Sequence, residues 1–113
     1  MHELALSQSI VSLVSEQARH HGFRSVARVV VEVGAAAGVE PEALQFCFDV
    51  AAERTCVEGA ELVIVPIALR ARCRACNAEY MPDSLIAPCT NCGSYERDVL
   101  AGQELRVTRF EAS

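Results

Sequence analysis

Residues 73–93 have the sequence CRACNAEYMPDSLIAPCTNCG, and this stretch decides how the chain around it folds. It contains four cysteines in two Cys-x-x-Cys pairs, which are Cys73/Cys76 and Cys89/Cys92. Each pair can place two thiolates on one side of a tight turn, and two facing turns form the tetrahedral sulfur cage that suits Zn²⁺. Asn77 and Gly93 follow the two pairs, and both residue types tolerate the left-handed backbone that such a fold-back needs. The pattern predicts a structural zinc site.

Two other interpretations of these cysteines are disulfide bonds and a redox-active pair. The chain begins Met1-His2-Glu3 and not with a Lys/Arg cluster, and it has no run of about 18 apolar residues. We therefore expect neither a signal peptide nor a membrane span. This places the protein in the reducing cytoplasm, where paired cysteines bind metal more often than each other. Sulfur geometry alone does not distinguish zinc from iron.

The charge pattern argues against nucleic acid as a partner. The chain has 113 residues, a formal net charge of −5 and no lysine. Arg70, Arg72 and Arg74 gather beside the first cysteine pair, and Arg97 follows farther on. A nucleic-acid-binding protein needs a broader basic field to neutralise phosphates, so we interpret these arginines as solvated side chains around a metal-binding lobe.

Two amphipathic helices are predicted. Residues 4–20 place apolar side chains at helical spacing, with Ser7 on the side that faces water. The apolar residues of this stretch are Leu6, Ile10, Leu13, Val14 and Ala18. Gly22 is expected to end this helix, and a second helix is expected to begin at Pro41. The predicted core stripe of the second helix is Leu44, Cys47, Phe48 and Ala51, widened by Phe46 and Val50.

Three strands are predicted as well. Residues 26–33 form the first, with Val29, Val31 and Val33 facing the core and Arg28 and Glu32 pointing away. Residues 61–69 form an almost wholly apolar strand, in which Pro66 indicates a sheet edge or a bulge. Residues 103–110 form the last strand. The loop at 34–38 is rich in small residues but lacks the lysine and Ser/Thr of a phosphate-binding loop, so we interpret it as a connector.

These elements predict an α+β fold, with a three-stranded sheet, two helices on one face and an inserted Cys₄ zinc-binding lobe. Residues 1–70 and 98–113 are expected to form the α+β domain, and residues 71–97 the zinc-binding domain. The two ends of an inserted lobe must lie close together. We therefore expect strands 61–69 and 103–110 to pair antiparallel.

The first three residues form a second candidate metal site. The α-amine, the amide nitrogen of His2 and its imidazole can close adjoining chelate rings around one cation, and the amide nitrogen of Glu3 can complete a planar set. Nitrogen-rich planar coordination is preferred by Ni²⁺ and Cu²⁺, and affinity rises with pH because the metal displaces protons. The carboxylates of Glu3 and Glu40 are further oxygen ligands if the fold brings Glu40 near.

Taken together, several segments resemble the HypA/HybF nickel-incorporation proteins, which are metallochaperones for the maturation of [NiFe]-hydrogenases. These segments are MHEL at 1–4, VEPEALQF at 39–46, EGAEL at 58–62, the two cysteine pairs and GQELRV at 102–107. The resemblance covers nearly the whole chain in order.

The resemblance implies a role for each candidate residue. His2 is the essential nickel ligand, helped by the N-terminal amine and the Glu3 amide, and Glu40 stands where the family can offer an acidic residue. The four cysteines hold structural Zn²⁺, whereas Ni²⁺ is transient cargo. The implied partners are the maturation GTPase (HypB) and the immature hydrogenase large subunit. Unlike some relatives, this chain has no histidine beside its cysteine pairs, so a pH-driven change of zinc ligands is not expected.

Three other functional classes are alternatives to a nickel carrier, and each predicts different features of the chain. A zinc-ribbon-like adaptor binds protein or nucleic acid without nickel transfer, and it needs no ligand at the N-terminus. An electron-transfer protein holds iron in the same cage, which a visible absorption band reveals. We do not expect an enzyme, because the histidines at 2, 20 and 21 lie far in sequence from any nucleophile motif.

Overall fold

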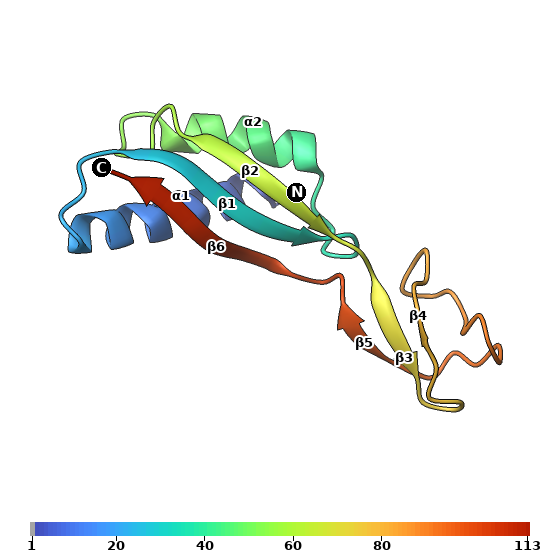
Figure 1. Ribbon diagram of the computed structural model, residues 1–113. Coiled ribbons are helices and arrows are strands. Elements are labelled where there is room, and N and C mark those ends of the chain that lie inside the picture. Colours follow the sequence, from blue (N-terminus) through green and yellow to red (C-terminus); the bar gives the residue numbers. More distant parts are fainter. Residues whose placement is uncertain (1) are drawn as a thin grey trace. The chain divides into compact units, whose positions relative to one another are not determined.

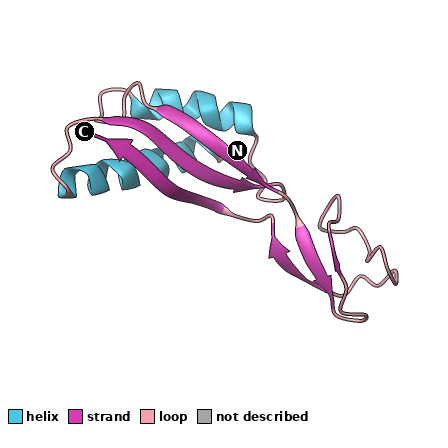
Figure 2. Cartoon of the chain, in the orientation of Figure 1, coloured by secondary structure: helices cyan, strands magenta, loops and turns pink. Residues whose placement is uncertain are grey.

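The computed structural model describes residues 2–113, which form two helices and six strands (Figures 1 and 2). In chain order the elements are α1 (Glu3–His20), β1 (Val26–Gly34), α2 (Pro41–Ala52), β2 (Glu61–Ile67), β3 (Arg70–Cys73), β4 (Glu79–Tyr80), β5 (Arg97–Ala101) and β6 (Leu105–Ala112). Their contacts group the chain into two compact units. The first unit comprises the residues up to Val31 together with 39–65 and 106–113, and the second comprises 32–38 and 66–105.

Helix α1 buries a stripe that differs in part from the predicted one. Ile10, Val14 and Ala18 are buried as expected, whereas Leu13 is 50% exposed and Ser7 is fully buried. The predictions for Leu13 and Ser7 were therefore wrong. The buried arc is rotated toward the side of the helix that carries Ser7, where the hydroxyl donates a hydrogen bond to the Leu44 carbonyl at 3.3 Å. A buried serine is tolerated because its polar group has this partner.

The end of α1 is the predicted one. His21 caps the helix, Gly22 has a φ of +77°, and the Phe23 amide donates to the Ala18 carbonyl at 2.9 Å. This six-residue closure is typical of a helix that ends at a glycine. The ring of His21 stacks on Phe23 and its Nδ1 lies 2.9 Å from the Gln17 carbonyl, so this histidine has a structural role.

Helix α2 starts with a side-chain cap and packs against α1 through a narrow stripe. Glu40 is the N-cap, and its Oε1 accepts hydrogen bonds from the amides of Glu42 at 2.8 Å and Ala43 at 3.2 Å. The residues of α2 that are buried are Leu44, Phe48 and Ala52. Phe46 and Val50 were predicted to widen the core, and this prediction was wrong because they are 70% and 44% exposed.

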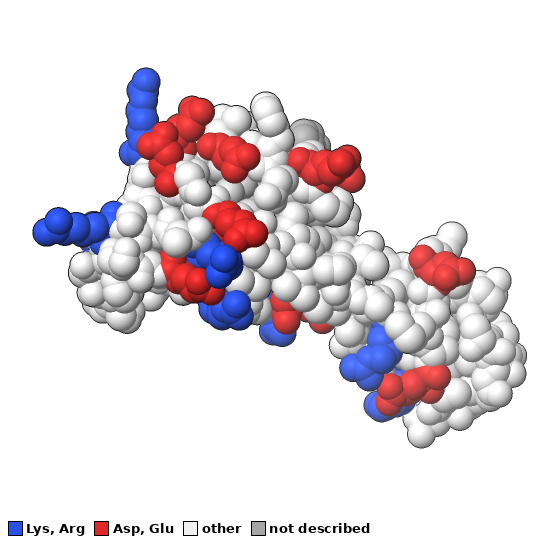
Figure 3. All heavy atoms as spheres, turned by 45° about the horizontal axis from the view of Figure 1, so that its top comes forward, with Lys and Arg blue, Asp and Glu red and all other residues white. Residues whose placement is uncertain are grey.

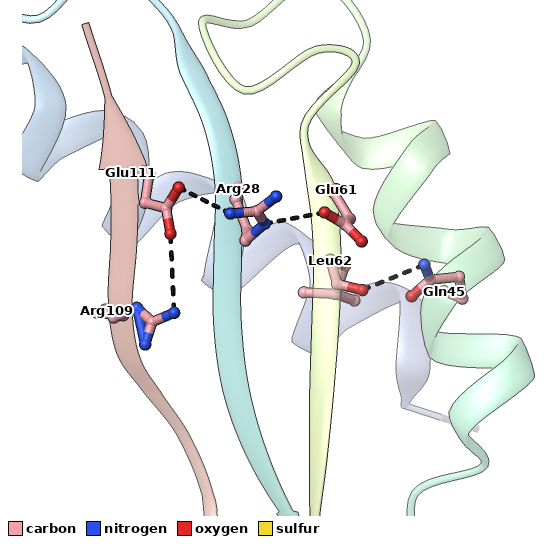
Figure 4. Close-up of polar contacts among 6 residues, drawn as sticks. All are labelled: Arg28, Gln45, Glu61, Leu62, Arg109 and Glu111. Carbon is pink, nitrogen blue, oxygen red and sulfur yellow. Dashed lines mark hydrogen bonds and ion pairs between the residues drawn. The ribbon is translucent and has the colours of Figure 1, made fainter.

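The first sheet has the strand order β2-β1-β6, and both helices lie on one face of it (Figure 1). Val29, Val31 and Val33 of β1 are buried as predicted. On the same strand Arg28 is half-exposed and forms ion pairs of 2.8 Å with Glu61 of β2 and with Glu111 of β6 (Figure 4). These pairs link the middle strand to both neighbours. Pro66 lies in the edge strand β2, which confirms its predicted position.

The predicted pairing of residues 61–69 with 103–110 was wrong, because β1 lies between β2 and β6 in the sheet. The chain leaves β2 at Ile67 and starts a second sheet at Arg70, with the order β4-β3-β5. In this sheet β3 pairs antiparallel with β5, and Ala71 lies opposite Val99. The expected hairpin is therefore formed by β3 and β5, which close the inserted segment before the chain returns to the first sheet.

The second unit contains a site of very close backbone packing at Gly34, Leu69 and Gly102. A Cβ added at Gly34 would lie 2.1 Å from the Gly102 carbonyl oxygen, and one added at Gly102 would lie 2.5 Å from Leu69 Cα. Gly102 also has a φ of +111°. The neighbouring amides are used by the backbone, since Gly34 donates to Glu104 and Ala36 donates to Gly102, both at 2.7 Å. The loop at 34–38 is therefore a connector, and its amides bind the backbone carbonyls of Gly102 and Glu104.

Candidate metal centres

The two cysteine pairs form two matched turns in the second unit. The Asn77 amide donates to the Cys73 carbonyl and the Gly93 amide donates to the Cys89 carbonyl, each at 2.9 Å. Asn77 has a φ of +66° and Gly93 a φ of +79°, which confirms the left-handed positions predicted after each pair. Because each turn folds back at the residue after its second cysteine, both sulfurs of a pair point to the same side.

The four sulfur atoms converge on one point. All four Sγ atoms lie within 4.8 Å of one another, with Cys73 and Cys92 3.5 Å apart and Cys76 and Cys89 3.7 Å apart. A tetrahedral zinc site with bonds of about 2.3 Å separates its sulfurs by roughly 3.8 Å. The observed distances fit this geometry and are far longer than a disulfide bond of about 2.05 Å. All six cysteines of the chain, each within the described residues, are free of disulfides.

The surroundings of the sulfurs favour thiolates. The Asn91 side-chain amide, 3.4 Å from Cys76 Sγ, and the Ala78 amide lower the pKa of the Cys76 thiol to about 6. The amides of Cys76 and Ala75 likewise lower the pKa of Cys73. The Ser94 amide acts in the same direction on Cys92, but the neighbouring Cys73 sulfur, partial desolvation and the Cys76 and Cys89 sulfurs outweigh it and raise the pKa of Cys92 to about 12.

The lowered pKa values of Cys73 and Cys76 and the raised pKa of Cys92 indicate that the first thiols of the cluster lose their protons easily, whereas the last one does not. Four thiolates at this separation repel one another, and a bound divalent cation removes that repulsion. Cys73 and Cys89 are buried, Cys76 is half-buried and Cys92 is exposed, so the cation would be held at the surface of the lobe. The donor set and its hydrogen bonds therefore fit a four-coordinate metal ion. Asn91, which no sequence pattern singled out, supports two ligands, because its side-chain amide donates to Cys76 Sγ and its backbone amide donates to Cys89 Sγ at 3.3 Å.

The second candidate site lies at the start of α1. The α-amine belongs to Met1, which is outside the described residues. His2 is exposed and occupies the N-cap position, where its carbonyl accepts from the Leu6 amide at 2.8 Å. Its side chain makes no capping hydrogen bond. The imidazole is therefore available to a ligand from solvent.

The fold brings Glu3 and Glu40 together, although they are 37 residues apart. Glu3 is only 5% exposed, and its Oε2 accepts a hydrogen bond from the Glu40 amide at 3.0 Å. This bond is the main reason that the pKa of Glu3 is lowered. Within residues 2–113 the other oxygen, Oε1, is buried without a hydrogen-bond partner. The Glu40 carboxylate itself caps α2, so both acids have structural roles beside any role toward a metal.

A scan against family models matches residues 1–112 to the model described as "Hydrogenase/urease nickel incorporation, metallochaperone, hypA". The chain belongs to the HypA family. It is 43% identical over 111 residues to the hydrogenase maturation factor HypA of Acidithiobacillus ferrooxidans, a match that covers 98% of each chain. It is also 43% identical over 110 residues to the protein of that name from Chlorobaculum tepidum, covering 97% of each.

Solved HypA structures share the fold. A solution structure of a HypA protein superimposes with a TM-score of 0.74 at 26% identity, covering all of this chain and 97% of that one. The solution structure of the Ni metallochaperone HypA from Helicobacter pylori gives a TM-score of 0.70 at 25% identity, covering 99% and 97%. The chain is thus a member of a family of nickel metallochaperones that act in hydrogenase maturation.

The arginines beside the HypA cysteine lobe are paired with acids. Arg70 and Arg72 both contact the Glu79 carboxylate, at 2.9 and 2.6 Å, and Arg74 contacts Asp98 at 2.7 Å. These two carboxylates offset two of the three positive charges, which weakens the main sequence feature that could attract phosphates. Across the described residues 2–113, no helix is long and apolar enough to cross a membrane.

Proposed function

We propose that this protein holds Ni²⁺ at its N-terminus and delivers it to the immature large subunit of a [NiFe]-hydrogenase. The maturation GTPase (HypB) would assist the transfer. The observation that carries this proposal is the exposed imidazole of His2, which makes no capping hydrogen bond at the start of α1. The chain that carries it matches the HypA family over residues 1–112. The role is that of a carrier and not of a catalyst.

The ligand set follows from the position of His2 on the helix. The first amides of an α-helix have no partner inside the helix, and the first intrahelical bond observed in α1 runs from Leu6 to His2. The amide nitrogens of His2 and Glu3 therefore precede the regular bonding of α1. We propose that these two nitrogens, the α-amine and the His2 imidazole form a planar set for Ni²⁺. Glu3 and Glu40 would supply a nearby negative charge or an oxygen ligand.

We propose that the four cysteines hold structural Zn²⁺. The compact sulfur cluster and its N–H···S bonds support a closed site of four protein ligands, as structural zinc requires. Such a site needs thiolates that stay reduced, which fits a protein working in the cytoplasm. Zinc would stabilise the lobe and take no part in holding the cargo.

The first experiment is a titration of untagged protein with Ni²⁺, with elemental analysis of the bound ions. We expect His2→Ala to lose most of the nickel affinity while it keeps zinc content and the circular dichroism of the native protein. His20→Ala is the matched control, because His20 is also an exposed histidine of α1, and it should bind nickel normally. An N-terminal extension should weaken nickel binding even with His2 present, since it removes the free amine.

The outcomes separate the parts of the proposal. If wild type ignores Ni²⁺, or if His2→Ala binds it equally well, the protein is not a carrier at this site and a zinc-stabilised adaptor remains. If the extended protein binds nickel as tightly as the native one, the amine is not a ligand. A transfer assay to the purified large subunit, with and without the GTPase, then tests delivery.

A further inference from the structure

Helix α2 exposes two large apolar side chains on its outer surface. Phe46 is 70% exposed and Val50 is 44% exposed, and they are four residues apart, which places them side by side on one helix face. Single exposed apolar residues are common and need no explanation. An adjacent aromatic and aliphatic pair on a helix whose other face is already packed is less easily explained by folding alone.

The acidic residues around this pair also lack an explanation from helix stability. Glu42 and Asp49 of α2 and the C-cap residue Glu53 are exposed and lie within two turns of Phe46, and the exposed Arg54 directly follows Glu53. Asp49 and Glu53 are four residues apart and lie at the C-terminal end of α2, so they repel each other and oppose the helix dipole. The last turn of α2 contains no basic residue, and no arginine within residues 2–113 forms an ion pair with these three acids. In Figure 3, which brings the top of Figure 1 forward, red side chains are spaced among uncharged ones, and blue side chains lie beside them at one end.

The charge of this face decides between possible occupants. A second copy of the chain would set the same acids against each other, which is repulsive. An anionic membrane or a nucleic acid would be repelled as well. We propose that the Phe46–Val50 face of α2 is the docking surface for a protein partner that presents an apolar recess bordered by Lys and Arg. Phe46 fills the recess and the acids set the orientation.

The position of this surface connects it to nickel transfer. Glu40, the N-cap of α2, is tied to Glu3, and Phe46 follows Glu40 by six residues, or about 9 Å along a helix axis. A partner seated on Phe46 would therefore lie beside the proposed nickel ligands. Only the connection of this surface to nickel transfer rests on the proposed function, since docking itself can be measured without nickel.

The test is a nickel-free binding titration of the purified chain with the maturation GTPase and, separately, with the immature large subunit. We expect Phe46→Ala to weaken the Kd for at least one of them tenfold or more, as for a central aromatic anchor. Asp49→Lys should weaken the same complex, and more strongly at low salt than at high salt. Phe23→Ala and Asp83→Lys are matched controls, because both residues are exposed and lie outside α2. Neither control should change the Kd.

Three results would overturn the proposal. They are wild-type protein that binds neither partner, α2 variants that bind like the controls, and an oligomer of the free chain that Phe46→Ala dissolves. His2→Ala should keep full partner affinity, so the two proposals fail separately. If nickel binding proves independent of His2 while Phe46→Ala still weakens the complex, docking stands and the carrier role falls.

Discussion

The Glu3 carboxylate accepts a hydrogen bond of 3.0 Å from the backbone amide of Glu40. This bond joins the first turn of α1 to the N-cap of α2, so the starts of both helices are held together. The amide it uses belongs to a residue whose own side chain caps α2. The Glu3 carboxylate thus fixes the backbone of Glu40, and this backbone positions the Glu40 carboxylate that caps α2.

Replacing Glu3 tests the charge and the hydrogen bond separately. Glu3→Ala should lower the melting temperature more than Glu3→Gln, because glutamine keeps an oxygen that can accept from the Glu40 amide. The folded-state pKa of Glu3 is lowered, mainly by that amide. Its ionised form therefore stabilises the fold above its usual pKa, and this contribution is lost as pH falls through the lowered value. The measurement is thermal unfolding from pH 7 down to pH 3, in which Glu3→Gln should show a weaker acid dependence; an unchanged dependence would contradict the assignment.

Asn91→Ala should weaken metal binding at the cysteine cluster by about 10- to 100-fold, as for other residues that support a metal ligand. The change removes the side-chain amide that contacts Cys76 Sγ but keeps the Asn91 backbone donor to Cys89. Competition with a zinc chelator measures the loss. Thr90→Ala, an exposed neighbour, is the control and should keep its metal. Equal affinities for the two variants would show that Asn91 does not stabilise the thiolate.

The left-handed backbone at Asn77 predicts a difference between two substitutions. Asn77→Gly should leave the stability and metal retention of the lobe nearly unchanged. Asn77→Val should cost about 1–2 kcal/mol, because a β-branched residue is strained at a φ of +66°. Denaturant unfolding of the metal-loaded protein gives both values. The prediction fails if valine and glycine are tolerated equally.

Gly102→Ala should destabilise the protein by about 3 kcal/mol or more, because a methyl group would overlap the Leu69 backbone at an already unusual φ. Gly38→Ala is the matched control, since Gly38 has a φ of +76° but no atom within 4 Å of an added Cβ. It should cost only about 1 kcal/mol. The difference between the two unfolding free energies isolates the steric part. A similar cost at both positions would mean that the close packing relaxes easily.

The parts of this molecule that could be predicted from sequence are those set by local chemistry. The cysteine turns depend on spacing and on the two residues that follow the pairs, and both have the expected backbone. The end of α1 at Gly22 and the start of α2 at Pro41 are likewise local. The long strand predicted at 61–69 divides at Ile67, because the chain changes sheets there, and no local signal marks that change.

The errors share a physical origin in tertiary partners. Ser7 is buried because a carbonyl of α2 lies within its reach, and hydrophobicity alone assigns serine to the surface. Phe46 is exposed although it is among the most apolar residues of α2. Its hydrophobicity predicted a core position that the fold does not provide. The order β2-β1-β6 depends on which strands meet across the sheet. For the N-terminal ligands, sequence supplies the donors, and their binding of nickel stays a prediction.

The place of His2 at the head of α1 has one further electrostatic consequence. Aligned peptide dipoles put roughly half a positive charge at the start of a helix, so a cation there meets repulsion from the helix itself. The same field makes nearby nitrogens easier to deprotonate, which helps them coordinate. A metal bound at this point would be held by its ligands although the positive end of the helix dipole repels it. Transfer of the ion to a ligand set that lies away from any helix start would remove this repulsion, so the transfer is favoured by the same amount.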